Sequence, residues 1–208
     1  MPSDPYRRIA SAYERVIDPT NRRLHSVIRK RHPAPAGSRI LDIGCGTGAQ
    51  LEGYLGEDRV LAGIDLSPSM LERARHRLGP EADLRLGSAT ELPFQDGSFD
   101  QVLCSLVLHE IPSQARLDVL GQVRRVLAPD GRLITVEFTT APGSVKGRLL
   151  RALTWPVERL AGAAHFRHFR DFVATGGFPA LADRCGLRIE SSFDVAGGNM
   201  CISVALVD

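Results

Sequence analysis

The chain of 208 residues has few cysteines, almost no net charge and no long apolar run. No apolar segment approaches the roughly 18 residues that a transmembrane helix needs, so a membrane span is not expected. The first residues, MPSDPYRRIASAYER, lack the apolar core of a secretory signal, and we expect a cytoplasmic protein. The four cysteines form no C-x-x-C pair, so a zinc ribbon, any other metal site and a disulfide scaffold are not expected.

The composition is that of a globular protein, and the small net charge of +2 conceals three blocks of different sign. Hydrophobic residues make up 43% of the chain and charged residues 24%, which excludes a disordered protein. Residues 1–39 carry nine Lys or Arg and three Asp or Glu, residues 40–140 carry nine and fifteen, and residues 141–208 carry eight and six. The chain therefore has a basic arm, an acidic middle and a mildly basic tail.

Short apolar segments bounded by turn-forming residues predict strands at residues 40–43, 60–65, 84–86, 99–105, 132–138, 187–195 and 200–207. The spacing of apolar residues predicts helices at residues 47–55, 68–78, 112–127, 145–160 and 178–184, while residues 165–175 favour no single structure. Strands and helices that alternate in this way indicate an α/β protein with a mostly parallel sheet. Gly197-Gly198-Asn199 predicts a hairpin between the last two strands.

The strongest local signal is the segment DIGCGTG at residues 42–48, between the first strand and the helix expected after it. Glycines let the backbone turn sharply and approach a ligand closely, and a helix N-terminus adds inward-facing amides. With Ala49 in the sixth place the loop also reads G-x-G-x-x-A, which is typical of nicotinamide dinucleotide sites. A tight turn with a purely structural role is a third interpretation.

Two aspartates help to decide between these interpretations of the glycine loop. Asp65 ends the second strand, where a carboxylate can accept hydrogen bonds from both hydroxyls of a ribose, so it favours either nucleotide interpretation. Asp42 lies two residues before the first glycine, where an acidic side chain would repel the pyrophosphate of a dinucleotide. S-adenosylmethionine carries an ammonium and a sulfonium, so it suits this acidic entrance better.

Five motifs occur in a family-typical order, namely ILDIGCGTG at residues 40–48, GIDLSPSML at 63–71, ATELPF at 89–94, FDQV at 99–102 and RVLAPDGRL at 125–133. On these motifs the chain resembles the class I S-adenosylmethionine-dependent methyltransferases over about half its length. It is similar in particular to the group of quinone-biosynthesis and small-molecule methyltransferases. The resemblance implies a doubly wound, mostly parallel, seven-stranded sheet with an antiparallel last strand. It also implies S-adenosyl-L-methionine as cofactor, with S-adenosyl-L-homocysteine as product.

The resemblance further implies roles for individual residues. The methionine end of the cofactor would contact the glycine loop and the end of the fourth strand, through Asp42, Gly44, Cys45, Gly46 and Ser105. Asp65 would bind the ribose hydroxyls, and Leu66 would lie beside the adenine. Ser88 and Ala89 would face the adenine, with Ser88 standing where the family commonly has aspartate. Tyr13 matches an N-terminal tyrosine that closes over the cofactor, although helical spacing equally predicts a core aromatic there.

Histidines are the candidate bases for removing a proton from the acceptor. His109 follows the fourth strand, at the sheet edge where doubly wound folds bind ligands, and is either a catalytic residue or a packing residue. His165 and His168 belong to the repeat HFRHFR, which puts like residues three apart on one helix face. That repeat is either part of the acceptor site or an ordinary solvated segment.

We expect residues 1–36 to form a helical lid and residues 37–208 to form the methyltransferase domain, with a cap over the acceptor at about residues 139–177. Five aromatic residues in or next to that cap favour a small apolar or ring-bearing acceptor, such as a quinone or a lipid, namely Trp155, Phe166, Phe169, Phe172 and Phe178. Nucleic acid is disfavoured because the Asn/Asp-Pro-Pro-aromatic motif of its methyltransferases is absent. Contact with a membrane surface and the oligomeric state stay open. The alternatives are an NAD(P)-dependent oxidoreductase and a noncatalytic cofactor-binding module.

Overall fold

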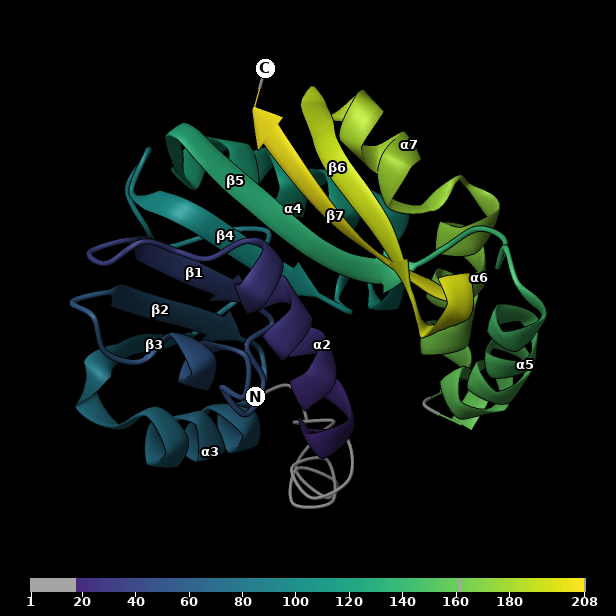
Figure 1. The fold of residues 1–208 in the computed structure, drawn as a ribbon, viewed down its shortest axis with the longest axis horizontal. Coiled ribbons are helices and arrows are strands. Elements are labelled where there is room, and N and C mark those ends of the chain that lie inside the picture. The colour runs from purple at the N-terminus through teal and green to yellow at the C-terminus, as the bar shows by residue number, and fades with distance from the viewer. Residues whose placement is uncertain (1–17, 161, 208) are drawn as a thin grey trace.

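The computed structural model describes residues 18–160 and 162–207, which fold around a seven-stranded sheet of order β3-β2-β1-β4-β5-β7-β6 (Figure 1). The strands are β1 (Arg39–Ile43), β2 (Val60–Asp65), β3 (Ala82–Leu86), β4 (Phe99–Ser105), β5 (Leu127–Phe138), β6 (Leu187–Val195) and β7 (Met200–Val207). Strands β1 to β5 pair in parallel, and β7 is antiparallel to both β5 and β6. The doubly wound sheet and the antiparallel last strand expected from the sequence are confirmed.

The order of the strands places a topological switch point between β1 and β4. The chain passes from β1 to β2 and β3 on one side, and from β4 to β5 on the other. In such sheets the loops after the two central strands diverge and leave a crevice at their carboxyl ends, which is where ligands bind. The glycine loop after β1 and the segment after β4 therefore border the candidate site.

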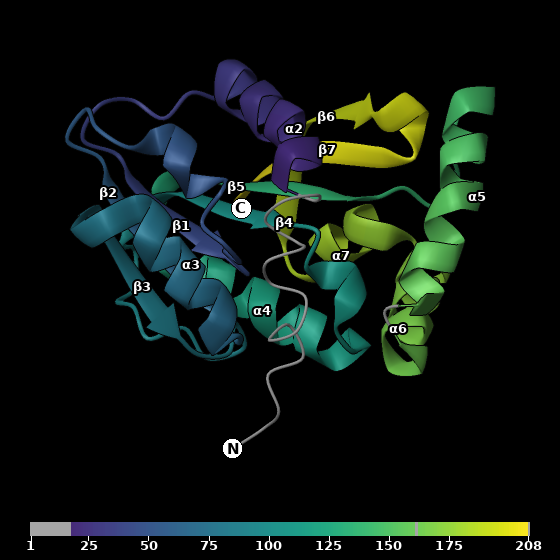
Figure 2. The same cartoon turned by 90° about the horizontal axis from the view of Figure 1, so that it is seen from below.

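Helices cover both faces of the sheet, as Figure 2 shows for α2 (Asp18–Arg31) on one side and α4 (Ser113–Val126) on the other. The first face buries side chains of α4, α6 (Ala163–Ala174) and α7 (Gly177–Arg184) against β1, β4 and β5. The second buries Ile28 of α2 together with side chains of α3 (Pro68–Leu78) against the same strands. No helix in the described ranges is both long and apolar enough to span a bilayer.

Two expectations about local structure need correction. The helix expected after the glycine loop is only a 3-10 turn, η2 (Leu51–Tyr54), so no helix N-terminus points into the loop. Three glycines explain this. Gly48 and Gly53 lie within the expected helix and each lowers helix stability by about 1 kcal/mol, while Gly48 and Gly56, on either side of the 3-10 turn, have φ values of +75° and +80°. Strand β5 begins at Leu127 rather than at residue 132, and its pairing with β4 shifts register across the Pro129-Asp130-Gly131 turn.

Other local predictions are confirmed. Ser67 caps α3, because its side chain accepts a hydrogen bond from the Met70 amide, and Pro68 is the first residue of that helix. The two C-terminal strands form the expected hairpin, whose turn contains Gly197 and Gly198 at φ values of +67° and +86°. The segment that favoured no single structure is helix α6, and it follows α5 (Val145–Leu160) beyond the carboxyl end of β5 (Figure 1).

A buried arginine fastens α6 to the segment after β4. Arg116, on α4, is 1% exposed. Its Nε donates to the Leu108 carbonyl at 2.9 Å, and its two terminal nitrogens donate to the Asp171 carboxylate at 2.7 Å and to the His168 carbonyl at 2.6 Å. One guanidinium therefore joins three elements of the fold, and its loss would leave buried acceptors without a donor.

Replacing Arg116 with alanine is expected to lower the free energy of unfolding by roughly 2–5 kcal/mol, because these acceptors lose their only charged donor. Urea denaturation followed by circular dichroism measures the change. Arg124→Ala is the matched control, because Arg124 lies on the same helix and is exposed, and it is expected to change the free energy by less than about 0.5 kcal/mol. If both substitutions lowered the free energy of unfolding equally, Arg116 would not stabilise the fold through these hydrogen bonds.

Candidate functional site

The glycine loop turns sharply at the end of β1 and lies against the segment after β4. Gly44, Gly46 and Gly48 have φ values of +66°, +52° and +75°, a region that side chains rarely adopt. A Cβ at Gly44 would lie 2.5 Å from the Val107 side chain, so this position has no room for a larger residue. A Cβ at Gly46 would meet no protein atom within 4 Å, which leaves its backbone open to a ligand.

Asp65 connects the end of β2 to this loop. One of its carboxylate oxygens accepts a hydrogen bond from the Gly46 amide at 2.8 Å, and the other accepts one from the Ser67 amide at 2.8 Å. These two bonds fix the carboxylate at the carboxyl edge of the sheet. Each oxygen has a further lone pair, so the group can accept additional bonds from a ligand.

The larger of two cavities at this edge has a volume of about 340 Å³. Seven of the residues expected at the cofactor line it, namely Gly44, Gly46, Asp65, Leu66, Ser88, Ala89 and Ser105. The remaining wall is mostly apolar and comes from the segment after β4 and the start of α4, including Val107, Ile111 and Ala115. The ends of β1, β2 and β4 and the segment after β3 thus meet around one space, as the sequence predicts.

The smaller cavity, of about 50 Å³, lies between the glycine loop and α2. Asp42, Cys45 and Gln50 line it from the loop side, and Asn21 and Leu24 line it from α2. It shares Gly44, Gly46, Ser105 and Leu106 with the larger cavity. The two spaces therefore adjoin at the point where β1 and β4 diverge, and together they can hold an elongated ligand.

Two buried polar atoms at these cavities have no hydrogen-bond partner within the described part of the chain. They are the Ser105 hydroxyl, where the two cavities adjoin, and the amide nitrogen of Gln50, in the smaller cavity. A buried polar group without a partner costs about 1–3 kcal/mol, so a polar ligand that supplies partners would recover that energy. Gln50 was not among the residues expected from the sequence.

Asp42 is 3% exposed and lies on β1 behind the glycine loop. Burial raises the pKa of its carboxyl well above the usual range, and the negative charge of Asp65 adds to this effect. A positively charged ligand group beside Asp42 would favour its ionised form. Burial also raises the pKa of the Cys45 and Cys104 thiols well above their usual range, which makes both poor nucleophiles.

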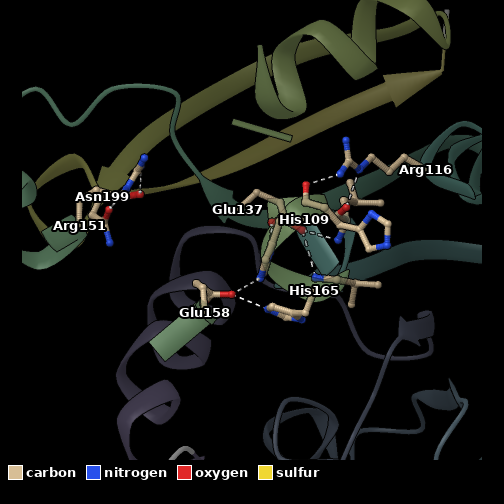
Figure 3. A network of polar contacts seen from close by, with 10 residues as sticks. His109, Arg116, Glu137, Arg151, Glu158, His165 and Asn199 are labelled. Carbon is tan, nitrogen blue, oxygen red and sulfur yellow. Dashed lines mark hydrogen bonds and ion pairs between the residues drawn. The ribbon is translucent and has the colours of Figure 1, made fainter. Parts of the chain in front are cut away.

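His109 does not face these cavities. It belongs to the 3-10 turn η4 (Leu108–Glu110), is 3% exposed, and donates from Nδ1 to a Glu137 carboxylate oxygen at 2.7 Å (Figure 3). The other oxygen of Glu137 accepts hydrogen bonds from the Val107 and Leu108 amides at 3.0 and 2.7 Å. Burial by itself would lower the pKa of His109, but Glu137, assisted by Glu110 and Glu158, raises it above the ordinary value.

His165 joins His109 through Glu158, while His168 lies apart from them. The His165 Nε2 atom is 2.5 Å from a Glu158 oxygen, and the same oxygen is 3.9 Å from the His109 Nε2 atom. His168 contributes its backbone carbonyl to Arg116, and burial lowers the pKa of its ring, with the charge of Arg116 adding to this. The structure thus brings two of the three candidate bases together, and a catalytic role for any of them stays a prediction.

The expected aromatic residues divide into two groups. Phe169, Phe172 and Phe178 are at most 2% exposed and pack α6 and α7 onto the sheet, so they belong to the core. Trp155 is 39% exposed and packs edge-on against Phe166 at 5.5 Å between ring centroids. Tyr13 lies outside the described residues, as do all the other residues before α2.

Sequence reasoning missed Glu137, Glu158 and Arg116, each of which pairs with residues of another helix, strand or turn. Glu137 carries one usable signal, because it is an acidic residue inside the apolar strand LITVEF. A charge in a buried strand requires a partner, so a search for buried carboxylates would have found it.

The fold and the cavities define a class, that of the class I S-adenosylmethionine-dependent methyltransferases, which bind their cofactor at this edge of a sheet with this strand order. Residues 41–135 match the model of a methyltransferase domain family, and the chain belongs to that family. The match decides between the two nucleotide interpretations in favour of S-adenosylmethionine.

Two curated relatives extend the match. The chain is 35% identical over 143 residues to a demethylmenaquinone methyltransferase from Clavibacter sepedonicus, covering 66% of this chain and 58% of the relative. It is 30% identical over 167 residues to a ubiquinone biosynthesis O-methyltransferase from Xanthomonas axonopodis pv. citri, covering 78% of this chain and 66% of the relative. The chain therefore spans less than two thirds of the length of these relatives.

Solved structures share the fold at lower sequence identity. A SAM-dependent methyltransferase from Aquifex aeolicus superposes with a TM-score of 0.68 at 18% identity, covering 96% of this chain and 98% of that one. A TehB-like SAM-dependent methyltransferase from Corynebacterium glutamicum gives a TM-score of 0.60 at 24% identity, covering 98% and 94%. These likenesses support the fold and carry no information about the acceptor.

Proposed function

We propose that the chain transfers a methyl group from S-adenosylmethionine to a small, ring-bearing acceptor of the quinone or lipid type. The observation that carries this proposal is the pair of adjoining cavities at the switch point, whose volumes of about 340 and 50 Å³ together suit an elongated cofactor such as S-adenosylmethionine. The acceptor class is supported by the two curated relatives, whose names refer to menaquinone and ubiquinone.

In this proposal the two cavities receive opposite ends of the cofactor. The Asp65 carboxylate, held by the Gly46 and Ser67 amides, accepts hydrogen bonds from the ribose hydroxyls. Leu66, Ser88 and Ala89 hold the adenine in the larger cavity. Asp42, Gly44, Cys45, Gly46 and Ser105 surround the methionine end, and the free amide nitrogen of Gln50 is a donor for its carboxylate.

The acceptor site is completed by α2. Asn21 and Leu24 of this helix line the smaller cavity beside Leu106, so α2 covers the place where the reacting groups meet. The lid expected for residues 1–36 stays a prediction, and its described part is this helix and residues 32–36 of the connection to β1. Ile28 of α2 is fully buried, so the helix is also part of the core rather than a separate arm.

S-adenosylmethionine brings an activated methyl group on its sulfonium sulfur, and the protein therefore contributes mainly alignment. Orientation of bound reactants can lower a barrier by about 7–11 kcal/mol. The buried pair of Glu137 and His109 serves this alignment, because Glu137 fixes the Val107 and Leu108 amides beside the cavity. Neither residue lines the cavities, so we assign them a positioning role.

Asp65→Ala is expected to weaken binding of S-adenosylhomocysteine at least about tenfold, since two ribose hydroxyls lose their acceptor. Calorimetry measures the affinity, and circular dichroism shows whether the fold persists. Asp118→Ala is the control, because Asp118 is exposed on α4 and lines neither cavity. An unchanged affinity in the folded Asp65 variant would show that the ribose assignment is wrong.

The affinity for S-adenosylhomocysteine, which retains the ammonium group, is expected to depend on pH through Asp42. Its pKa is raised in the ligand-free protein, and a bound ammonium lowers it, so binding releases a proton while Asp42 is protonated. Affinity should therefore rise with pH until the pH passes the raised pKa of Asp42 in the ligand-free protein, and then stay constant. Calorimetry between about pH 5 and pH 8 measures this. Asp42→Asn should bind more weakly and lose this dependence, whereas the same slope in both proteins would exclude Asp42 as its source.

The acceptor is tested with a panel of demethylated quinols, catechols and short peptides, using radiolabelled S-adenosylmethionine. Methyl transfer to a ring-bearing quinol or catechol supports the proposal, and transfer to peptides alone contradicts it.

Leu24→Ala is expected to raise the KM for the acceptor at least about threefold with little effect on folding, because Leu24 is only partly buried. Val27→Ala, a substitution of another partly buried residue of α2 outside the cavity, is the control.

A further inference from the structure

Three side chains with metal-ligating atoms converge between the segment after β4 and the cap. They are His109 of η4, Glu158 of α5 and His165 of α6, and their ligating atoms all lie within 4.8 Å of one another. Glu158 lies between the two histidines, with its oxygen 2.5 Å from the His165 Nε2 atom and 3.9 Å from the His109 Nε2 atom (Figure 3). The cluster lies outside both cavities described above.

We propose that His109, Glu158 and His165 form a binding site for one divalent transition-metal ion of the zinc type. Two imidazole nitrogens and one carboxylate oxygen are a ligand set that binds Zn²⁺ and leaves a fourth position for water. Mg²⁺ and Ca²⁺ prefer sets made of oxygen atoms alone, so the two imidazoles select against them. The sequence predicted no metal site, because these residues come from three separate elements and have no characteristic spacing.

The surroundings of His109 are those of a metal-ligating histidine. Its Nδ1 atom donates to Glu137, so the Nε2 atom faces Glu158 and offers its lone pair to an ion once that atom has lost its proton. Metal-bound histidines almost always donate their second nitrogen to a carboxylate or a carbonyl in this way, which fixes the ring and increases its basicity. Glu137 is itself fixed by two backbone amides, so the orientation of His109 is set before any ion binds.

The distances require only small shifts. Ligand atoms around a tetrahedral zinc ion lie about 3.3 Å apart, given bonds of about 2.0–2.1 Å. The Glu158–His165 distance of 2.5 Å would have to open and the Glu158–His109 distance of 3.9 Å would have to close, each by less than about 1 Å. The two histidine nitrogens lie within 4.8 Å of one another, so they would have to approach by at most about 1.5 Å. Binding of the ion displaces the proton that His165 and Glu158 share, and that proton passes to solvent.

The site is shielded but reachable. The rings of Phe138 and Phe169 pack edge-on against His109, with centroid distances of 4.9 and 5.9 Å. The side chains of Glu158 and His165 are 11% and 19% exposed, so an ion can enter from the side of α5 and α6. An ion held there would fasten α5 and α6 to η4, whose own residue Glu110 and whose neighbour Val107 line the larger cavity.

The test uses the full chain without an affinity tag, freed of metal with a chelator. Zn²⁺ is titrated in competition with a chromogenic chelator, and Co²⁺ is titrated by its visible absorption, which reports on imidazole ligands. One equivalent of each ion is expected to bind, with a rise in the thermal midpoint. His165→Gln is expected to weaken binding at least about 100-fold, and Glu137→Gln about 10- to 100-fold.

His168→Gln is the matched control, because His168 lies one turn further along α6 and outside the cluster, and it is expected to keep the affinity of the wild-type protein. Circular dichroism verifies that each variant is folded. Absence of stoichiometric binding in the wild-type protein would overturn the proposal. Equal binding in the wild-type protein and in His165→Gln would overturn it as well, since the ion would then be held elsewhere, for example by cysteines.

The metal site does not depend on the proposed methyl transfer. Binding of S-adenosylhomocysteine is measured in the same samples, before and after removal of the metal. The two cavities and the cluster share no residue, so loss of metal binding with intact cofactor binding counts only against the metal site. Intact metal binding without cofactor binding counts only against the methyltransferase assignment.

Discussion

The buried carboxylate of Glu137 fixes the segment that separates the cofactor cavities from the cap. One of its oxygens accepts hydrogen bonds from the Val107 and Leu108 amides, and the other accepts one from the His109 ring. A carboxylate that is 3% exposed is costly unless it is fully hydrogen-bonded, so this network permits one arrangement of the chain after β4. The cavity on one side and the histidine cluster on the other both depend on it.

A second carboxylate plays the corresponding part on the other side of the switch point. Asp65, at the end of β2, accepts hydrogen bonds from the Gly46 amide and from the Ser67 amide at the start of α3. The glycine loop is therefore fixed by a charge from the neighbouring strand rather than by a helix of its own, since only a 3-10 turn follows it. A cationic cofactor fits this acidic edge of the sheet. The excess of acidic residues that the sequence shows at 40–140 is explained in this way.

Two arginines, one buried and one partly buried, attach α5 and α6 to the rest of the fold. Arg116 connects η4 to α6, and Arg151 of α5 donates to the Asn199 side chain and to the Thr139 carbonyl at 2.6 Å each. Both arginines donate hydrogen bonds to oxygen atoms that apolar side chains in their place would leave without a partner. The cap is thus held in a defined orientation, which brings Glu158 and His165 to His109.

Local sequence signals carried much of the fold. Ser67 and Pro68 mark the start of α3, and the glycines at 197 and 198 mark the last hairpin, because each acts on its own backbone. The helix expected after residue 47 was wrong, since three glycines outweigh the apolar spacing there. The cap was the hardest part, because the repeat HFRHFR has a regular period but its packing partners lie elsewhere.

The sequence by itself determined the alternation of strands and helices, the glycine loop and the aspartate that ends β2, since each depends on neighbouring residues or on a short motif. The identity of the family followed from the same motifs. Only the tertiary structure decided which partner each charged side chain meets. Glu137 meets His109, Glu158 meets His165, and Arg116 meets two backbone carbonyls. The physical reason is that a buried charge selects its partner by proximity in the folded chain, and sequence spacing does not encode proximity between elements that lie far apart.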